Sequence, residues 1–142
     1  MELGVIGLGR MGRIVVDRCL DAGHDVVAFD IDADARANAG DAGATAVDSI
    51  PSVADELGDD ERVWLMVPAG DPVDAALDEL APHLGSEAVV VDGGNSHFED
   101  STRRASEHEF AYLDCGTSGG PASAENGFSL MVGGPEWAYD EL

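Results

Sequence analysis

The sequence predicts an α/β fold, a doubly wound and mostly parallel sheet with helices on both faces, over residues 1–142. Three observations support this prediction. Apolar runs of strand length alternate with helix-patterned segments, the first run enters a glycine turn with the spacing G-x-G-x-x-G, and the connections are short, as right-handed parallel crossovers allow. This combination is typical of a Rossmann-type domain that binds a dinucleotide.

The first element is an apolar strand over 3–6 that runs into Gly7-Leu8-Gly9-Arg10-Met11-Gly12 and then into a helix that reaches about Ala22. Gly7 permits the tight turn, Gly9 leaves room for a pyrophosphate at the helix N-terminus, and Gly12 lets the helix pack closely on the sheet. We expect the buried face of this helix to carry Met11, Val15, Cys19 and Ala22, and the solvent face to carry Arg10, Arg13, Asp17 and Asp21.

A second strand over 25–29 ends in Asp30, which lies 18 residues after Gly12. A carboxylate at this place accepts hydrogen bonds from the adenosine ribose and repels a 2′-phosphate, so the expected cofactor is NAD and not NADP. Ile31 follows, where an NADP-binding protein would more often have an arginine. The alternative is a solvated Asp30 that only begins a turn.

The middle of the chain continues the alternation. A helix over 33–42 is closed by Gly43, a short strand over 45–47 leads to a helix from Pro51 to about residue 57, and the apolar run 62–67 reads as a central strand. The next helix is expected to have Asp71 as its N-cap and Pro72 at its first position. Its expected buried stripe consists of Val73, Ala76, Leu77, Leu80 and Leu84, with Pro82 stopping or kinking it near Ala81.

The last third of the chain contains two further polar loops. A buried strand over 88–91 runs into 92–96, a polar helix follows over about 98–108, and a strand over 110–113 runs into 114–121. A strand over 128–132, a turn at 133–134 and a helix from Pro135 complete the pattern. The loops at 7–12, 68–69, 93–96 and 116–121 all follow predicted strands, so we expect them to converge on one cleft at the carboxyl ends of the sheet.

The charge of the chain is strongly negative. Asp and Glu number 29 against seven Lys and Arg, the formal net charge is −22, and all seven basic residues are arginine. Mutual repulsion would destabilise the compact state at low salt, whereas about 1 M salt shortens the screening length to about 3 Å. We therefore expect a cytoplasmic protein from a high-salt interior, with a merely acidic domain as the alternative. The same charge disfavours nucleic acid as a partner.

Several classes of protein are not indicated. Hydrophobic residues make up 44% of the chain, which is typical of a globular domain. No apolar run approaches the ~20 residues of a membrane span, and no secretory signal precedes the first strand, so we expect no membrane association. Cys19 and Cys115 read as small buried residues, and the four histidines show no ligand spacing, so no metal is expected.

Four motifs carry a resemblance to a known family, and together they span nearly the whole chain. They are Gly7–Gly12, Asp92-Gly93-Gly94-Asn95-Ser96, Ser118-Gly119-Gly120 and Leu130-Met131-Val132-Gly133-Gly134. This set resembles the amino-terminal domain of 6-phosphogluconate dehydrogenases, within the β-hydroxyacid dehydrogenases. The stretch 113–120 is similar to the shorter, NAD-using branch, in agreement with Asp30.

The resemblance implies roles for individual residues. The cofactor would be held by Gly7, Leu8, Gly9, Arg10, Met11, Gly12, Asp30, Val67, Pro68, Ala69 and Asn95, and the substrate by Asn95, Ser118, Gly119 and Gly120. The Asn95 carboxamide can donate and accept hydrogen bonds at once, which suits substrate hydroxyls beside a nicotinamide. Two positions depart from the long-chain pattern: Pro68 stands where those enzymes have a lysine, and Pro121 replaces an acidic residue.

The implied reaction belongs to a longer protein. Hydride would pass from C3 of 6-phosphogluconate to NAD, and the β-keto acid would lose CO₂ to give ribulose 5-phosphate. The family's general base is a lysine and its general acid a glutamate, both on helices after this domain, and this chain has no lysine. We therefore expect the chain to bind cofactor without turning over substrate, with a helical catalytic and dimerisation domain lying outside it and a homo-oligomer for the full-length protein.

Alternatives remain for the roles of single residues and for the function of the protein. Asn95 could cap the following helix, Gly93-Gly94 could be only a tight turn, and Ser118–Gly120 could be a flexible loop. A 3-hydroxyisobutyrate-type dehydrogenase would share the fold and the first motif, and a non-catalytic NAD sensor would need only the glycine turn and Asp30. For the phosphate of the small anionic sugar-acid substrate, His97, Arg103 and Arg104 are the basic candidates near a site loop.

Overall fold

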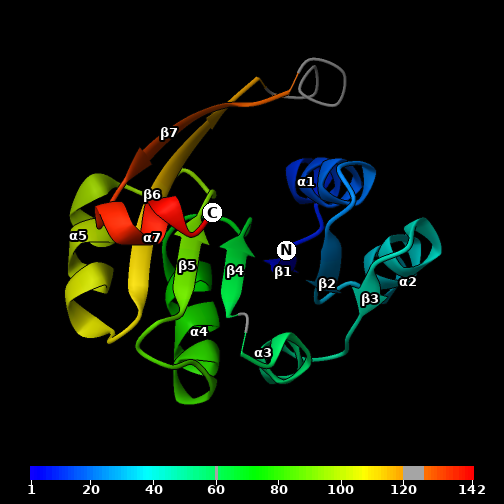
Figure 1. Cartoon of the computed structure of the whole chain (residues 1–142), viewed down its shortest axis with the longest axis horizontal. Coiled ribbons are helices and arrows are strands. Elements are labelled where there is room, and N and C mark those ends of the chain that lie inside the picture. Colours follow the sequence, from blue (N-terminus) through cyan, green and yellow to red (C-terminus); the bar gives the residue numbers. More distant parts are fainter. Residues whose placement is uncertain (60, 120–126) are drawn as a thin grey trace.

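The computed structural model describes residues 1–59, 61–119 and 127–142. The elements are, in chain order, β1 (Glu2–Ile6), α1 (Arg10–Asp21), β2 (Asp25–Phe29), α2 (Ala33–Ala42), β3 (Thr45–Ala46), α3 (Ile50–Leu57), β4 (Arg62–Leu65), α4 (Asp71–Leu80), the 3₁₀ turn η1 (Ala81–His83), β5 (Val89–Asp92), α5 (Phe98–Glu107), β6 (Ala111–Ser118), β7 (Ser129–Gly133) and α7 (Glu136–Asp140). Strands and helices alternate from β1 to β6 (Figure 1). The predicted α/β class is confirmed.

The sheet has the strand order β3-β2-β1-β4-β5-β6-β7. The first six strands pair in parallel, and β7 runs antiparallel to β6 at the edge. β1 pairs with β2 on one side and with β4 on the other, so the direction of chain winding reverses between β1 and β4. In open α/β sheets ligands bind outside the carboxyl ends of the strands at such a switch point.

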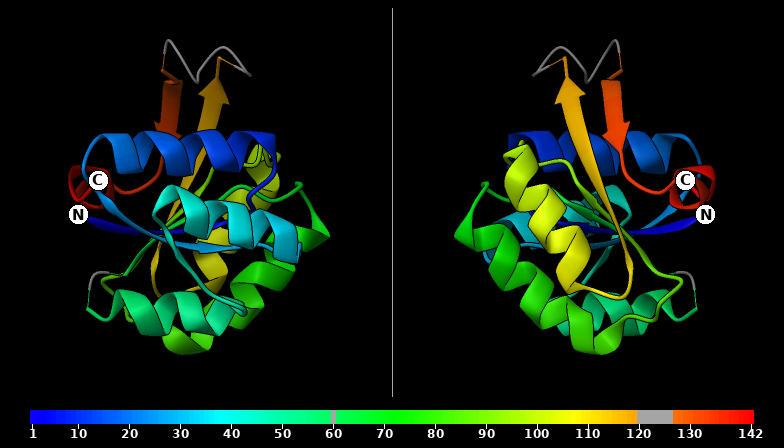
Figure 2. Two further views of the ribbon diagram at one scale, coloured as in Figure 1. Left: turned by 90° about the vertical axis from the view of Figure 1, so that its right-hand side faces the viewer. Right: turned by 90° about the vertical axis from the view of Figure 1, so that its left-hand side faces the viewer.

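Helices cover both faces of this sheet. Helices α1 and α2 lie on one face, and α3 and α4 lie on the other (Figure 2). The two faces have separate cores, one that includes Val5, Val16 and Ala39 and one that includes Val53, Leu65 and Leu77. A third cluster lies under α7 and includes Ala138 and Leu113. Because β1, β4 and β5 are covered on both faces, their continuous apolar sequences are explained.

Two helix predictions need correction. In α1 the buried residues are Gly12, Val15 and Val16, whereas Ala22 is exposed and forms the C-cap. The face that meets the sheet is thus rotated from the predicted stripe, because Gly12 brings the first turn against the glycine loop. In α4 the N-cap is Gly70, not Asp71, which is the first helical residue. The expected stop after Leu80 is confirmed, since Pro82 lies in the 3₁₀ turn.

The predicted end of β6 is wrong. The apolar pattern stops at Leu113, but the strand continues to Ser118 and pairs with β7 from Asp114 to Ser118. All five residues of β7 are exposed, and the β6–β7 ribbon extends beyond the body of the sheet (Figure 1). In the paired segments 114–118 and 129–133 only Cys115 is buried, so hydrophobic periodicity gives no signal for the length of the ribbon.

Candidate functional site

The cavity at the switch point has a volume of about 1020 Å³. It is lined from the carboxyl ends of five strands, with the glycine turn after β1, Asp30 after β2, Val67 and Pro68 after β4, and the loop 93–95 after β5. Thr117 of β6 also lines it. The predicted convergence of the loops on one cleft is therefore confirmed for residues of all four loops.

The three glycines of the turn meet different steric demands. Gly7 has a φ of +97°, and a Cβ there would lie 2.5 Å from the Met66 carbonyl oxygen. A Cβ at Gly12 would lie 1.8 Å from the carbonyl oxygen of Gly7, so no larger residue fits without moving the helix. At Gly9, the N-cap of α1, a Cβ would meet no heavy atom of the described chain within 4 Å. The turn is thus tight where it contacts the sheet and open where the helix N-terminus faces the cavity.

Asp30 connects the two halves of the cofactor motif. Its Oδ2 accepts a hydrogen bond of 2.6 Å from the backbone N–H of Leu8, and its Oδ1 accepts one of 2.8 Å from that of Asp32. A carboxylate has about four acceptor positions, so capacity remains for the hydroxyls of a ribose. The carboxylate therefore also fixes the glycine turn, a role that sequence reasoning did not identify.

The loop after β2 is held by Arg36. Its Nη1 donates to the carbonyl oxygens of Asp30 at 2.7 Å and Ile31 at 3.2 Å, and its guanidinium lies 6.0 Å from the centre of the Phe29 ring. Ile31 is 92% exposed and lines the cavity. Ile31 is apolar, Asp30 is acidic and Arg36 donates to the backbone, so these three residues offer little to attract a 2′-phosphate.

The loop that carries Asn95 is built on a buried carboxyl group. Asp92 is fully buried and accepts hydrogen bonds from the Gly94 N–H at 2.9 Å, the Ser96 hydroxyl at 2.5 Å and the Tyr112 hydroxyl at 2.5 Å. Burial, together with this carboxyl group, raises the pKa of Tyr112, so the phenol remains a donor. Asn95 itself is exposed, lines the cavity and has a φ of +65°.

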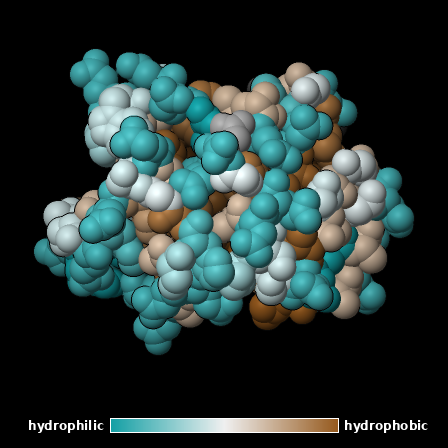
Figure 3. All heavy atoms as spheres, turned by 60° about the horizontal axis from the view of Figure 1, so that its bottom comes forward, coloured by the Kyte–Doolittle hydropathy of each residue, from teal (hydrophilic) through white to brown (hydrophobic). Residues whose placement is uncertain are grey.

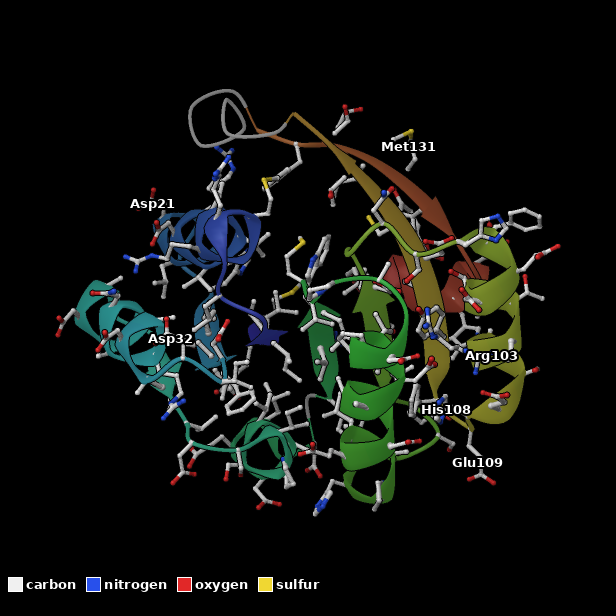
Figure 4. All side chains as sticks on the ribbon, turned by 180° about the vertical axis from the view of Figure 1, so that it is seen from behind. Asp21, Asp32, Arg103, His108, Glu109 and Met131 are labelled. Atoms are coloured by element: carbon white, nitrogen blue, oxygen red, sulfur yellow. The ribbon has the colours of Figure 1, made fainter. Side chains whose placement is uncertain are left out.

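Arg104 is buried beside this loop. Its guanidinium donates to Asp74 of α4, to the Ser96 hydroxyl and to the Gly70 carbonyl oxygen, and its side chain is 1% exposed. The hydrogen bond from Arg104 lowers the pKa of Asp74 to about 2. Arg103 lies on the same helix, pairs with Asp74 and Glu107, and is labelled in Figure 4. Neither arginine lines the cavity, so the structure does not favour them as phosphate ligands.

Most of the predicted cofactor residues lie together. The cavity is lined by Gly7, Gly9, Arg10, Met11, Gly12, Asp30, Val67, Pro68 and Asn95. Leu8 and Ala69 do not line it, although Leu8 contributes its N–H to Asp30. Ser118 is exposed on the β6–β7 ribbon, and neither it nor Gly119 is part of the cavity wall. Gly120 and Pro121 lie outside the described residues.

Sequence reasoning missed one wall of the cavity. Helix α4 lines it with Pro72, Ala75, Ala76 and Glu79. These positions follow the spacing i, i+3, i+4, i+7 of one helical face, next to the stripe of Val73, Leu77 and Leu80 that enters the core. The spacing was visible in the sequence, but two alanines and a glutamate do not distinguish a ligand-facing surface from a solvated one.

The thiols show no sign of reactivity. Cys115 is buried in β6, which confirms the prediction of a small buried side chain, whereas Cys19 of α1 is only half-buried. Burial together with the charge of Asp114 raises the pKa of Cys115 to about 11. Burial also raises the pKa of Cys19. Within 1–59, 61–119 and 127–142, no group of three or more His, Cys, Asp or Glu side chains is placed to hold a metal ion. No helix in these ranges has the length and apolar character to cross a membrane.

Comparison with known proteins agrees with this geometry. Residues 2–142 match the family model described as the NAD binding domain of 6-phosphogluconate dehydrogenase. The chain is 73% identical over 142 residues to the NAD(+)-dependent, decarboxylating 6-phosphogluconate dehydrogenase of Haloferax volcanii, and 36% identical over 149 residues to the decarboxylating enzyme of Candida albicans. These matches cover 100% and 99% of the chain but only 48% and 29% of the two relatives, so the chain spans half of their length or less.

The similar solved structures include a 6-phosphogluconate dehydrogenase and a 3-hydroxyisobutyrate dehydrogenase. The 6-phosphogluconate dehydrogenase of Plasmodium falciparum, described with NADP+ and with its substrate, matches with a TM-score of 0.87 and 27% identity, over 99% of this chain and 32% of that one. The 3-hydroxyisobutyrate dehydrogenase of Mycobacterium tuberculosis matches with a TM-score of 0.90 and 25% identity, over 98% of this chain and 48% of that one. With the family model covering nearly every residue, the chain belongs to the NAD-binding domains of 6-phosphogluconate dehydrogenases.

Proposed function

We propose that this chain is the cofactor domain of a longer enzyme that oxidises 6-phosphogluconate with NAD and releases CO₂, giving ribulose 5-phosphate. The observation that carries the proposal is the meeting of three features on one cavity: the glycine turn, Asp30 and Asn95. The 73% identity to an enzyme named for this reaction supports it. Bound NAD would supply the hydride acceptor, and every other role described here belongs to side chains and backbone.

The cavity fits a dinucleotide lying across the switch point. The open N-terminus of α1 at Gly9 would receive the pyrophosphate, with Arg10 beside it, and Asp30 would hold the adenosine ribose. The face of α4 from Pro72 to Glu79 would lie along the adenosine half, and Val67 and Pro68 would lie along the nicotinamide half. Asp30 and exposed Ile31 would select NAD over NADP, because a carboxylate repels a 2′-phosphate.

The substrate would bind at the Asn95 end of the cavity. The Asn95 carboxamide would hold substrate hydroxyls beside the nicotinamide, and Ser118, Gly119 and Gly120 would offer a hydroxyl and backbone N–H groups to the carboxylate. Thr117, which lines the cavity and donates to the Gly93 carbonyl oxygen at 3.3 Å, links this strand to the Asn95 loop. The proton-transferring lysine and glutamate would come from a helical domain that follows this chain.

A second candidate is a 3-hydroxyisobutyrate-type dehydrogenase. The TM-score of 0.90 to such an enzyme favours it, because the cofactor domain is nearly the same in both. The buried Asp92, whose three hydrogen bonds shape the Asn95 loop, favours the phosphogluconate reading, since it gives the Asp-Gly-Gly-Asn-Ser motif a defined structure. A purely NAD-sensing domain would give no reason for that loop to face the cavity.

Two measurements test the proposal. Calorimetric titration of this chain should show NAD binding more tightly than NADP, and tighter binding of NADP would contradict the cofactor assignment. The full-length protein should reduce NAD with 6-phosphogluconate and not with 3-hydroxyisobutyrate, with CO₂ released in equal amount. Activity with the second acid alone would move the protein to the alternative class.

We further propose that the protein works in a cytoplasm of high salt and assembles as a homo-oligomer through the part outside this chain. Among the described residues Asp92 is the only buried acidic residue, so the carboxylates lie at the surface. Figure 3 shows one face on which hydrophilic residues predominate. Concentrated salt would screen the repulsion among these charges.

A further inference from the structure

Arg104 is a buried charged residue to which the reaction assigns no role. Its side chain is 1% exposed, it lies on α5, and it does not line the cavity. A buried guanidinium is costly unless its donors are paired. Here the partners come from helix α4 and from two separate loops that contribute to the cavity wall, one after β4 and one after β5.

We propose that Arg104 is a positioning residue for Asn95, and that it sets the Asn95 loop at its working distance from the loop that carries Val67 and Pro68. The proposal rests on the function proposed above, because that function gives Asn95 its task. Arg104 would touch neither cofactor nor substrate.

The first set of contacts is with α4. The Nε of Arg104 donates to Oδ1 of Asp74 at 2.8 Å and its Nη2 donates to Oδ2 at 3.2 Å, so the planar guanidinium grips both carboxylate oxygens. Nη2 also donates to the Gly70 carbonyl oxygen at 3.1 Å. Gly70 has a φ of +92°, is the N-cap of α4 and follows Pro68-Ala69 directly, so this contact fixes the end of the β4 loop.

The second set of contacts is with the loop after β5. Nη1 of Arg104 donates to the Ser96 hydroxyl at 3.0 Å, and that hydroxyl donates in turn to Asp92. The other carboxylate oxygen of Asp92 accepts from the Gly94 N–H. Both neighbours of Asn95 are therefore held, and Asn95 itself is held at a positive φ of +65° that its side chain alone would not fix.

The two loops that Arg104 joins are also in direct contact with each other. A Cβ at Gly94 would lie 2.3 Å from the Val67 carbonyl oxygen, so the backbones already touch at the cavity wall. A shift of α5 or α4 would thus move Asn95 relative to the nicotinamide half of the cleft. Arginine suits this position because its rigid fork reaches three partners at fixed angles, which a lysine ammonium does not.

The experiment uses the full-length enzyme with Arg104→Lys, Ser96→Ala and the matched control Arg103→Lys. Arg103 is the adjacent arginine, shares the Asp74 partner and is 43% exposed, so it controls for loss of an ion pair on the same helix. We expect Arg104→Lys to lower kcat on the order of 100-fold, since small misplacements of reacting groups have such effects, while the Kd for NAD stays unchanged. Ser96→Ala should also lower kcat, whereas Arg103→Lys should leave kcat unchanged.

Three results would overturn the proposal. The first is an unchanged kcat in Arg104→Lys, and the second is an equal loss of kcat in Arg103→Lys. The third is a loss of kcat in Arg104→Lys that is matched by weaker NAD binding and a lower melting temperature, which would indicate a merely structural role.

Hydrogen exchange of the Gly94 amide gives a readout that does not need turnover. Exchange should be faster in Arg104→Lys than in Arg103→Lys, and equal exchange would contradict loop positioning. If the wild-type enzyme does not oxidise 6-phosphogluconate, the proposed function fails, and the exchange result still decides the claim about the loop.

Discussion

Single residues in the glycine turn decide whether the cofactor motif can form. Gly7 and Gly12 approach each other so closely that a Cβ at Gly12 would lie 1.8 Å from the Gly7 carbonyl oxygen. This contact is between a helix and the loop that precedes it, and neither partner can move without displacing β1 or α1. The motif is thus a packing requirement as well as a ligand-binding one.

Replacement of Gly12 by alanine should destabilise the chain. The added methyl group would force α1 away from the sheet, and overpacking of this kind costs about 1–3 kcal/mol. Urea unfolding measures the change. The matched control is Gly40→Ala in α2, where the Cβ would lie an ordinary 3.6 Å from Ala46 and where alanine favours the helix by about 1 kcal/mol. Equal effects of the two substitutions would contradict the steric argument.

Asp30→Ala should weaken NAD binding about 10- to 100-fold, because hydrogen bonds to a charged group contribute about 1.5–3 kcal/mol. The substitution removes the acceptor for the Leu8 N–H and for the proposed ribose contact. Asp30→Asn should instead lower the preference for NAD over NADP, since it keeps an acceptor and removes the charge. Calorimetric titration measures both effects. Asp32→Ala is the control, because Asp32 caps α2 and does not line the cavity. The NAD affinity of this variant should match that of the wild type.

At the scale of elements, the network of Asp92, Ser96, Arg104 and Asp74 joins α4, β5 and α5. The buried face of α5 consists of Ser101 and Arg104 and contains no apolar residue. This composition explains why hydrophobic periodicity predicts the helix only weakly. The helix is held by charge and hydrogen bonds to its neighbours, and these contacts are invisible in a sequence read one segment at a time.

Asp74 should make the stability of the chain depend on acid pH. The pKa of Asp74 in the folded chain is about 2, chiefly because of its hydrogen bond from Arg104, against an ordinary value of 3.8. A lowered pKa means that the stabilisation is complete above pH 4 and is lost as the pH falls from 4 towards 2. The unfolding free energy of the wild type should exceed that of Asp74→Asn above pH 4, and the difference should shrink below it. Asp78→Asn, on the same helix and exposed, should leave the profile unchanged.

At the scale of the whole molecule, surface charge opposes compactness. The net charge of −22 is spread over a surface on which nearly all described carboxylates are accessible. Salt screens the repulsion among all of these charges together, so its effect on the stability of the fold should be large even though each single exposed ion pair contributes little to that stability.

The melting temperature should therefore rise between about 0.1 M and about 1 M KCl, as the screening length falls from about 10 Å to about 3 Å. Circular dichroism at both concentrations checks this. A parallel scan in sucrose separates charge screening from general exclusion of solute, because sucrose carries no charge. Greater stability at the lower salt concentration would contradict the high-salt proposal.

The sequence by itself determined the order of elements, the sheet class, the glycine turn, the acid after the second strand and the family. Each of these depends on local pattern: strand length, turn chemistry, or a motif of fixed spacing. Gly12 is an example, since a Cβ there would meet the Gly7 carbonyl oxygen, which belongs to the same strand, turn and helix.

Only the tertiary structure decided that Asp30 holds the Leu8 N–H, that Ser118 is exposed on the β6–β7 ribbon and is not among the residues that line the cavity, and that Arg104 joins two loops. The physical reason is the same in each case. These features are contacts between residues far apart in the chain, and β6 extends to Ser118 through backbone pairing with β7, which leaves no trace in hydrophobic periodicity. Long-range hydrogen bonds become fixed only when the sheet places its strand ends side by side.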